Sequence, residues 1–370
     1  MPRPTYADVD LGAIRHNFRT LRALVPPAVR MLGVVKADAY GHGAVEVSRA
    51  LEAAGIDMLA VALVEEGRAL RDAGLRAPIL VMGVAPDDEI DPALACGLTL
   101  TVVDAETAAA VERRAAARGG RAAVHLKIDT GMNRLGVRAE DAAATAAAVA
   151  AMAHLDLEGA YTHFACADGA DDAASARQLA RLRAALGAMR EAGVRPPLVH
   201  AANSSALVTM PESHFGMVRT GLALYGVPPC KAAEGVNLRP ALSVRTRVAQ
   251  IKRAAAGEGV SYGHRWRAAR DSVLGVLAIG YADGYPRALG AAGGQARAGG
   301  RLVPVAGTVC MDAVMVDLTD VPGAAPGLEV VLIEADNSSP LGAAAVARLA
   351  GTIPYEIFTG LGRRLPRVYR

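Results

Sequence analysis

Short apolar runs, many of them rich in β-branched residues, recur at fairly even intervals along the first 221 residues. They are MLGVVK (31–36), MLAVAL (58–63), PILVMG (78–83), LTLTVV (98–103), AAVHLKID (122–129), LDLEGAYTHF (155–164), PLVHAAN (197–203) and FGMVRTG (215–221). Continuous apolar runs of this kind are typical of strands in a buried parallel sheet. The pattern therefore predicts eight buried strands.

The stretches between these runs indicate helices. GAVEVSRALEAAG (43–55) and VEEGRALRDAG (64–74) both end on glycine, the residue that commonly follows the C-terminus of a helix. An alanine-rich stretch, DAAATAAAVAAMAHL (141–155), also indicates a helix, and it is too short and too weakly apolar to span a membrane. Strands that alternate with helices predict parallel βαβ units, and eight such units make a (β/α)8 barrel.

The pattern changes after about residue 235. ALSVRTRVAQIKRA (241–254) alternates apolar and polar residues over part of its length, and SVLGVLAIG, RLVPVAG and AVMVDLTD follow with glycine-rich breaks. These are strand signals, with one late helical stretch at LGAAAVARLAG (341–351). GVPPCKAAEG (226–235) has the composition of a linker. We predict an α/β protein, with an N-terminal TIM-like (β/α)8 barrel over residues 1–235 and a C-terminal mainly-β domain over residues 236–370.

Charge and cysteine usage exclude several classes of protein. The net charge of +3 is spread along the chain without a dense basic stripe, so no nucleic-acid partner is predicted. Cys96, Cys166, Cys230 and Cys310 lie far apart without CxxC spacing, which argues against a zinc ribbon and gives no reason to expect a metal. The N-terminus carries no apolar signal segment, so we expect a reduced, cytoplasmic setting and no membrane partner.

Polar residues stand at the ends of the predicted strands, where a barrel enzyme carries its chemistry. The first strand delivers Lys36 and Tyr40. The later strands deliver Lys127, Asp129 and Arg134, then His163, then Asn203, Ser204 and Ser205, and finally Arg219 and Gly221. Taken singly, each has an ordinary explanation, such as a solvated lysine, a packed histidine or an arginine in an ion pair. Their convergence on one predicted barrel mouth favours a functional site.

A lysine in an apolar pocket has a lowered pKa and can form a Schiff base with an aldehyde cofactor. Pyridoxal phosphate is such a cofactor, and it also needs a phosphate cradle and a partner for its pyridine nitrogen. Phosphate sites of barrels commonly follow the seventh and eighth strands. Ser204, Gly221 and Leu222 stand there.

Nine motifs, in order along the chain, carry a family resemblance. They are VVKADAYGHG (34–43), KIDTGMNRLG (127–136), THFACAD (162–168), HAANSSA (200–206), VRTGLALYG (218–226), VSYGH (260–264), GYADGYPR (280–287), VCMD (309–312) and TIPYEI (352–357). The ordered set resembles the alanine racemases, which are fold-type III pyridoxal-phosphate enzymes. The resemblance covers nearly the whole chain and implies a barrel followed by a β domain.

The resemblance implies a role for each candidate residue. Lys36 would hold the cofactor and act as one base, and Tyr262 would be the other. Arg219 would face the pyridine nitrogen, and His163 would lie at the cofactor and support Tyr262. The residues implied for the phosphate are Tyr40, Ser204, Gly221, Leu222 and Tyr355. Those implied for the substrate carboxylate are Arg134 and the backbone of Met311, and those with supporting roles are Lys127, Asp312 and Tyr281. Lys127 matches a position that is carbamylated in some members.

A tyrosine that serves as a base needs a lowered pKa, because its ordinary value is near 10. We expect the neighbourhood of Arg219 and His163 to be positive and to supply that shift. Two positions depart from the family pattern: Thr308 stands where an arginine is usual, and Thr220 stands where a proline is common. The first bears on the charge of the active-site entrance, the second only on local loop shape.

The implied function is interconversion of L-alanine and D-alanine with pyridoxal phosphate and two bases. It would supply D-alanine for peptidoglycan or serve alanine catabolism. The resemblance also implies a homodimer in which Lys36 and Tyr262 of one site come from different chains. Alternatives are a racemase of broader substrate range on the same fold, a decarboxylase that joins a barrel to a β domain, and a non-enzymatic carrier of the cofactor.

Overall fold

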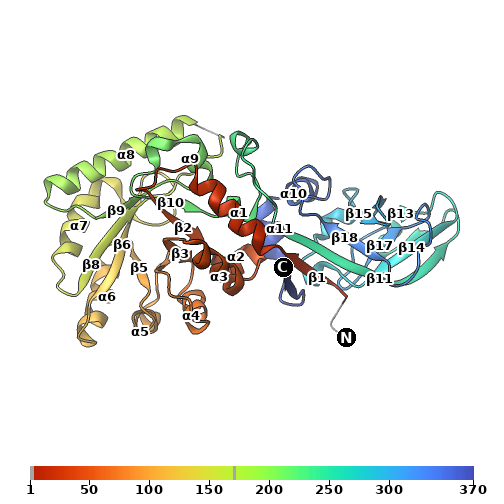
Figure 1. Cartoon of the computed structure of the whole chain (residues 1–370), viewed down its shortest axis with the longest axis horizontal. Helices are drawn as coiled ribbons and strands as arrows, with labels where there is room; N and C mark the ends of the chain where they lie inside the picture. Colours follow the sequence, from red (N-terminus) through yellow and green to blue (C-terminus); the bar gives the residue numbers. More distant parts are fainter. Residues whose placement is uncertain (1–3, 170–171) are drawn as a thin grey trace.

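The computed structural model describes residues 4–169 and 172–370 and consists of a barrel and a β domain that lie side by side (Figure 1). The barrel strands are β2 (Arg30–Val34), β3 (Met58–Val61), β4 (Ile79–Val81), β5 (Thr99–Val102), β6 (Ala122–Asp129), β8 (Leu155–Tyr161), β9 (Leu198–His200) and β10 (Met217–Thr220). All pair in parallel, and the sheet closes because β10 pairs with β2. Each strand lies on one of the eight predicted apolar runs, so the predicted (β/α)8 barrel is confirmed.

Helices cover the outside of the barrel (Figure 1). They are α1 (Leu11–Arg22), α3 (Ala44–Ala54), α4 (Val64–Asp72), α5 (Asp87–Ala95), α6 (Ala105–Ala117), α7 (Ala142–Ala150), α8 (Asp172–Glu191) and α9 (Ser204–Thr209). The predicted helices at 43–55 and 64–74 are confirmed as α3 and α4. Helix α7 is shorter than the alanine-rich stretch suggested, because β8 begins at Leu155.

The second part of the chain is mainly β-sheet, as predicted. Its strands are β1 (Tyr6–Val9), β11 (Leu242–Ala254), β12 (Gly259–Val260), β13 (Trp266–Arg267), β14 (Ser272–Leu277), β15 (Gln295–Ala298), β16 (Arg301–Pro304), β17 (Val314–Asp317), β18 (Glu329–Ile333) and β19 (Arg367–Tyr369). Two helices accompany them, α10 (Ala343–Ala350) and α11 (Pro354–Gly360). The predicted late helix is confirmed as α10.

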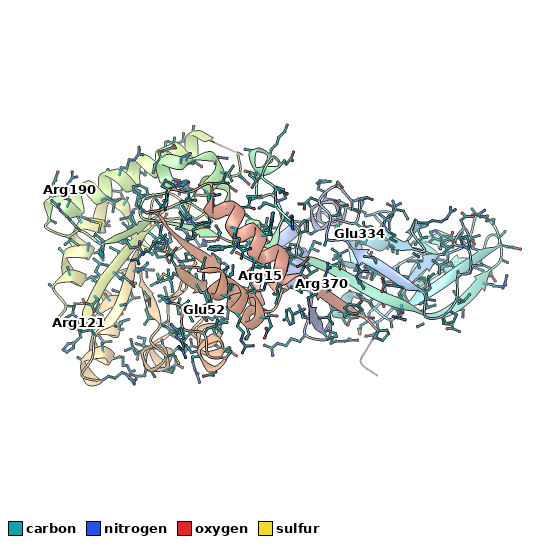
Figure 2. All side chains as sticks on the ribbon, in the orientation of Figure 1. Arg15, Glu52, Arg121, Arg190, Glu334 and Arg370 are labelled. Atoms are coloured by element: carbon teal, nitrogen blue, oxygen red, sulfur yellow. The ribbon has the colours of Figure 1, made fainter. Side chains whose placement is uncertain are left out.

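The first strand of the chain lies in the second sheet. β1 pairs antiparallel with β11 and parallel with β19, so β1 and the C-terminus lie near the junction of the two parts (Figure 1). Arg370, labelled in Figure 2, lies 3.3 Å from a carboxylate oxygen of Asp8 there. The predicted domain over residues 1–235 includes β1, and its pairing with the second sheet was not predicted. The boundary at residue 235 stays a prediction.

The remaining elements are short. They are α2 (Lys36–Gly41), β7 (Val137–Arg138), and the 3-10 turns η1 (Ala139–Asp141), η2 (Pro211–Ser213), η3 (Leu222–Tyr225), η4 (Lys231–Ala233), η5 (Tyr262–His264), η6 (Tyr281–Asp283) and η7 (Arg287–Gly290). Helix α11 packs on α2 so closely that a Cβ at Gly41 would lie 2.1 Å from the backbone oxygen of Phe358. A glycine is therefore required where the β domain meets the barrel mouth.

Charged side chains are distributed over both parts of the molecule. Figure 2 shows Arg121 and Arg190 on the barrel and Glu334 on the β domain. Within residues 4–169 and 172–370, no helix is both long and apolar enough to cross a membrane.

Candidate active site

Lys36 follows β2 and opens a left-handed turn, α2. Residues 37–40 have φ angles from 50° to 54°, although none of them is glycine. An L-residue in this conformation costs roughly 1–2 kcal/mol, so neighbouring groups must hold the turn. Glu66 accepts a hydrogen bond from the Ala37 N–H at 2.6 Å, and the Asp38 carboxylate accepts one from the Ala44 N–H at 2.7 Å.

The turn places Lys36 and Tyr40 in the wall of a cavity of about 670 Å³ at the mouth of the barrel. A cavity of this size is typical of a small-molecule site. The predicted residues that line it are Lys36, Tyr40, Lys127, Arg134, His163, Asn203, Ser204, Ser205, Arg219, Gly221, Leu222 and Tyr355. Tyr355 comes from α11, so the β domain of the same chain contributes to the wall.

Burial lowers the pKa of the Lys36 amine, and the nearby Arg134 guanidinium lowers it further. A lysine amine is nucleophilic only in its neutral form, and desolvation beside another cation is a recognised way to make that form accessible. Lys36 therefore lies in an environment that favours the neutral, nucleophilic amine.

Arg134 lies on the loop that follows β6. The Asp129 carboxylate fixes the start of this loop by accepting hydrogen bonds from the N–H groups of Gly131 and Met132, both at 2.9 Å. The loop thereby brings a guanidinium to the cavity on the side of Lys36.

Arg219 is the largest buried polar group of the site, with 2% of its surface exposed. Its Nη1 lies 3.0 Å from His200 Nδ1 and its Nη2 lies 3.1 Å from His163 Nδ1. Its Nη2 also donates to the backbone oxygens of Thr162 and Ala201, both at 2.9 Å. Because a guanidinium has only donors, both histidine Nδ1 atoms must accept and both rings must be neutral.

The pKa directions agree with these tautomers. Burial, followed by the charge of Arg219, lowers the pKa of His163 to about 2 and holds that of His200 well below its usual range. Burial lowers the pKa of Arg219 itself to about 10, so it remains a cation at pH 7. The neighbourhood of Arg219 and His163 therefore carries positive charge from Arg219, while His163 itself is neutral.

Two residues that border this site were not among those predicted from the sequence. Tyr161 and His200 are the last residues of β8 and β9, and their rings stack with centroids 4.6 Å apart. His200 Nε2 in turn lies 2.9 Å from His125 Nδ1, which extends the chain of rings into the barrel. The available signal was position, because both residues end a strand at the barrel mouth.

Lys127 lies over the ring of Tyr161, with its Nζ 5.1 Å from the ring centroid. Burial, followed by the charge of Arg219, lowers the pKa of this lysine to about 7. A large fraction of Lys127 is therefore the neutral amine near pH 7.

A cradle for an anionic group lies in the wall of the same cavity. The Gly221 N–H donates to Ser204 Oγ at 2.8 Å, and a Cβ at Gly221 would lie 2.9 Å from the Tyr40 hydroxyl. Burial raises the pKa of Tyr40, so its hydroxyl stays protonated as a donor, and the Tyr355 ring packs on it at 5.7 Å. The hydroxyls of Tyr40 and Ser204, beside the backbone of Gly221, fit a phosphate. Together with Lys36 and Arg219, they fit pyridoxal phosphate.

Four predicted site residues lie elsewhere, on loops of the β domain. Tyr262, Tyr281 and Met311 have 72%, 40% and 52% of their surface exposed, and Asp312 is also exposed. The Tyr281 N–H donates to the Cys310 backbone oxygen at 3.0 Å, so the loops lie together. None of the four residues lines the barrel cavity of its own chain as far as the described residues define it.

Comparison with known proteins identifies both parts of the chain. The family model for the alanine racemase N-terminal domain matches residues 9–229, and the model for the C-terminal domain matches residues 241–369. An alanine racemase of Symbiobacterium thermophilum is 44% identical, with 99% of this chain and 97% of the relative covered. One of Desulfovibrio desulfuricans is 41% identical, with 99% and 98% covered.

Solved structures agree. Alanine racemase of Clostridium difficile 630 superposes with a TM-score of 0.95 at 34% identity, with 100% of this chain and 96% of that chain covered. Alanine racemase of Bacillus anthracis with bound L-Ala-P superposes with a TM-score of 0.93 at 35% identity, with the same coverage. The chain belongs to the alanine racemase family.

Proposed function

We propose that this chain interconverts L-alanine and D-alanine with pyridoxal phosphate held in the barrel cavity. The alanine racemase family depends on this cofactor. One observation carries the proposal: a lysine with a lowered pKa, a phosphate cradle and a buried, permanently protonated arginine face one cavity.

Racemisation needs proton transfer at both faces of the α-carbon. When bound, pyridoxal phosphate withdraws electrons from that carbon and makes its proton acidic. Lys36 removes or returns the proton on one face. The guanidinium of Arg219 donates hydrogen bonds but keeps its protons. It therefore does not transfer a proton to an acceptor atom that faces it. Arg134 binds the carboxylate of alanine.

The second face requires a second base, and we assign it to Tyr262 of another copy of the chain. Tyr262 is exposed and lies outside the cavity of its own chain. A two-fold dimer would bring the loop of each chain to the cavity of the other and form two identical sites. Met311, Asp312 and Tyr281 would enter with it.

We expect a cytoplasmic enzyme, since Cys96, Cys166, Cys230 and Cys310 are free thiols and free thiols persist in a reducing compartment. The product D-alanine would serve peptidoglycan, or the enzyme would feed alanine catabolism. A neutral Lys127 is the form that reacts with carbon dioxide, which supports carbamylation at this residue.

The proposal is tested by chiral chromatography of L-alanine after incubation with the protein, with and without added pyridoxal phosphate. We expect an approach to equal amounts of both enantiomers that depends on the cofactor. Serine, lysine and arginine are assayed in parallel, and comparable rates with them would favour the broader-specificity alternative. No D-alanine from the cofactor-loaded protein would contradict the proposal.

A further inference from the structure

Among the described residues, none holds the side chain of Tyr262 by a hydrogen bond or a ring contact. Its exposed fraction is 72%, and among the described residues its hydroxyl makes no hydrogen bond and its ring contacts no other ring. Its direction is therefore set by the backbone on which it stands. The residues that fix this backbone decide where the phenol points.

That backbone is unusual. Ser261 and His264 have φ angles of 65° and 44°, and Gly263 between them has a φ of 73°. Left-handed conformations at residues other than glycine persist only when the surroundings over-determine them. A contact beyond the loop itself must therefore hold the residues on both sides of Tyr262.

The contact is a reciprocal pair of hydrogen bonds between this loop and the segment before Met311. Ser261 Oγ donates to the backbone oxygen of Thr308 at 2.6 Å, and Thr308 Oγ1 donates to the backbone oxygen of Tyr262 at 2.9 Å. Thr308 is 8% exposed, so little water competes for its bond. Because Thr308 precedes Met311 by three residues, the same pair fixes the spacing of two exposed site residues.

We propose that Thr308 and Ser261 are positioning residues that aim Tyr262 at the α-carbon through this pair of hydrogen bonds. The inference rests on the proposed role of Tyr262 as the second base. A proton transfer is sensitive to small displacements, since misplacement of a reacting group by about 1 Å can cost about 100-fold in rate. Loss of the Thr308 hydroxyl should therefore weaken the tyrosine face of the reaction and spare the lysine face.

The test follows loss of the α-proton in deuterated solvent, with L-alanine and with D-alanine, in the cofactor-loaded enzyme. Family membership implies that Tyr262 serves L-alanine and Lys36 serves D-alanine. Thr308→Val keeps the shape of the side chain and removes its hydroxyl, and Thr308→Ser keeps the hydroxyl. We expect Thr308→Val to lower exchange from L-alanine by about 10- to 100-fold, to leave exchange from D-alanine unchanged, and Thr308→Ser to restore the L-alanine rate.

Ser261→Ala provides a second variant with the same expected asymmetry, should Thr308→Val not fold. Its matched control is Ser272→Ala, since Ser272 Oγ also donates to a backbone oxygen of the β domain, that of Arg270 at 2.8 Å. We expect wild-type exchange at both faces in this control. Equal losses from both enantiomers in Thr308→Val or Ser261→Ala would overturn the proposal, because they would indicate a general structural effect.

Tyr262→Phe separates this inference from the proposed function. If Tyr262→Phe loses exchange from L-alanine while Thr308→Val and Ser261→Ala keep it, the pair of hydrogen bonds does not position the base and the inference alone is overturned. If Tyr262→Phe keeps exchange from both enantiomers, Tyr262 is not the second base, and both the proposed role and the inference fail.

Discussion

At the scale of single residues, the site depends on burial that changes the protonation of ordinary side chains. Lys36 and Lys127 both have lowered pKa values because burial disfavours their ammonium forms. His163 and His200 are neutral because Arg219 occupies their Nδ1 acceptors. The result is a cavity with a cation, Arg219, deep in its wall and two lysine amines whose pKa values are lowered, that of Lys127 to about 7.

Replacement of Lys36 tests the residue that opens the site. Lys36→Ala should abolish the absorbance of lysine-bound cofactor and lower the racemisation rate by at least about 100-fold, the usual contribution of an acid–base group. Absorbance spectra and chiral chromatography measure both effects. Lys252→Ala, at an exposed lysine of β11, is the control and should retain both. Retention of the band in Lys36→Ala would mean that another lysine carries the cofactor, and Lys127 would be the first to examine.

At the scale of elements, the left-handed turn α2 requires a neighbouring helix to hold it. Glu66, on α4, accepts hydrogen bonds from the N–H groups of Ala37, Ala62 and Leu63 at 2.6, 2.7 and 3.1 Å. One carboxylate thus ties the turn after β2 to the loop after β3. The position of Lys36 depends on this tie.

Glu66→Ala should therefore reduce both stability and activity. Removing the carboxylate acceptor leaves backbone donors without partners, which costs about 1–3 kcal/mol of unfolding free energy. The turn that positions Lys36 is then no longer held by Glu66. Urea denaturation and the racemisation rate measure the two effects. Glu65→Ala, at the exposed neighbouring residue, is the matched control and should be close to wild type. Equal behaviour of the two variants would show that Glu66 does not hold the turn.

The contact between α2 and α11 makes the junction sensitive to acid. His42 is fully buried between Tyr225 and Phe358, with ring centroids 4.5 and 4.8 Å away. Burial lowers its pKa from 6.5 to about 4. The unfolded chain therefore binds a proton at His42 between about pH 6.5 and 4, and the folded chain does not, so stability falls as the pH falls through this window.

His42→Phe should reduce this loss of stability, by an amount of about 3 kcal/mol between pH 7 and 4. Urea denaturation at several pH values in this window measures how steeply the free energy of unfolding changes with pH. This slope can be compared even if the absolute stability of the variant differs from wild type. Wild-type protein, measured at the same pH values, gives the reference slope. An unchanged slope in His42→Phe would show that His42 titrates normally in the folded chain.

Local pattern predicted the elements well and their long-range relations poorly. The barrel strands were predictable because each is a short apolar run, and Lys36 and Arg219 because they end such runs. The turn at residues 37–40 was not, since alanine, aspartate and tyrosine prefer right-handed conformations. The pairing of β1 with β11 joins residues more than 230 positions apart, and no local signal encodes it. Tyr161 and His200 were missed because a buried aromatic at a strand end is ordinary core.

At the scale of the whole molecule, the arrangement separates two groups of site residues. Lys36, Arg219 and the phosphate cradle lie at the barrel mouth, whereas Tyr262 and Met311 lie exposed on the β domain. In the proposed dimer, the exposed loop of each chain would lie at the barrel cavity of the other. Two-fold symmetry would then give two identical sites, each with one lysine and the tyrosine of the other copy.

Subunit mixing tests this central claim most directly. Lys36→Ala chains and Tyr262→Phe chains are each expected to be nearly inactive alone, and they are mixed in equal amounts under conditions that exchange subunits. In a mixed dimer, one site carries both mutations and the other carries neither. Random pairing makes about half of the dimers mixed, so about a quarter of all sites should be intact.

Activity should rise from near zero to about a quarter of the wild-type value as mixed dimers form. Native mass spectrometry measures their formation, and chiral chromatography measures the activity in the same samples. If mixed dimers form and no activity returns, the lysine and the tyrosine do not come from different chains, and the proposed shared site is wrong.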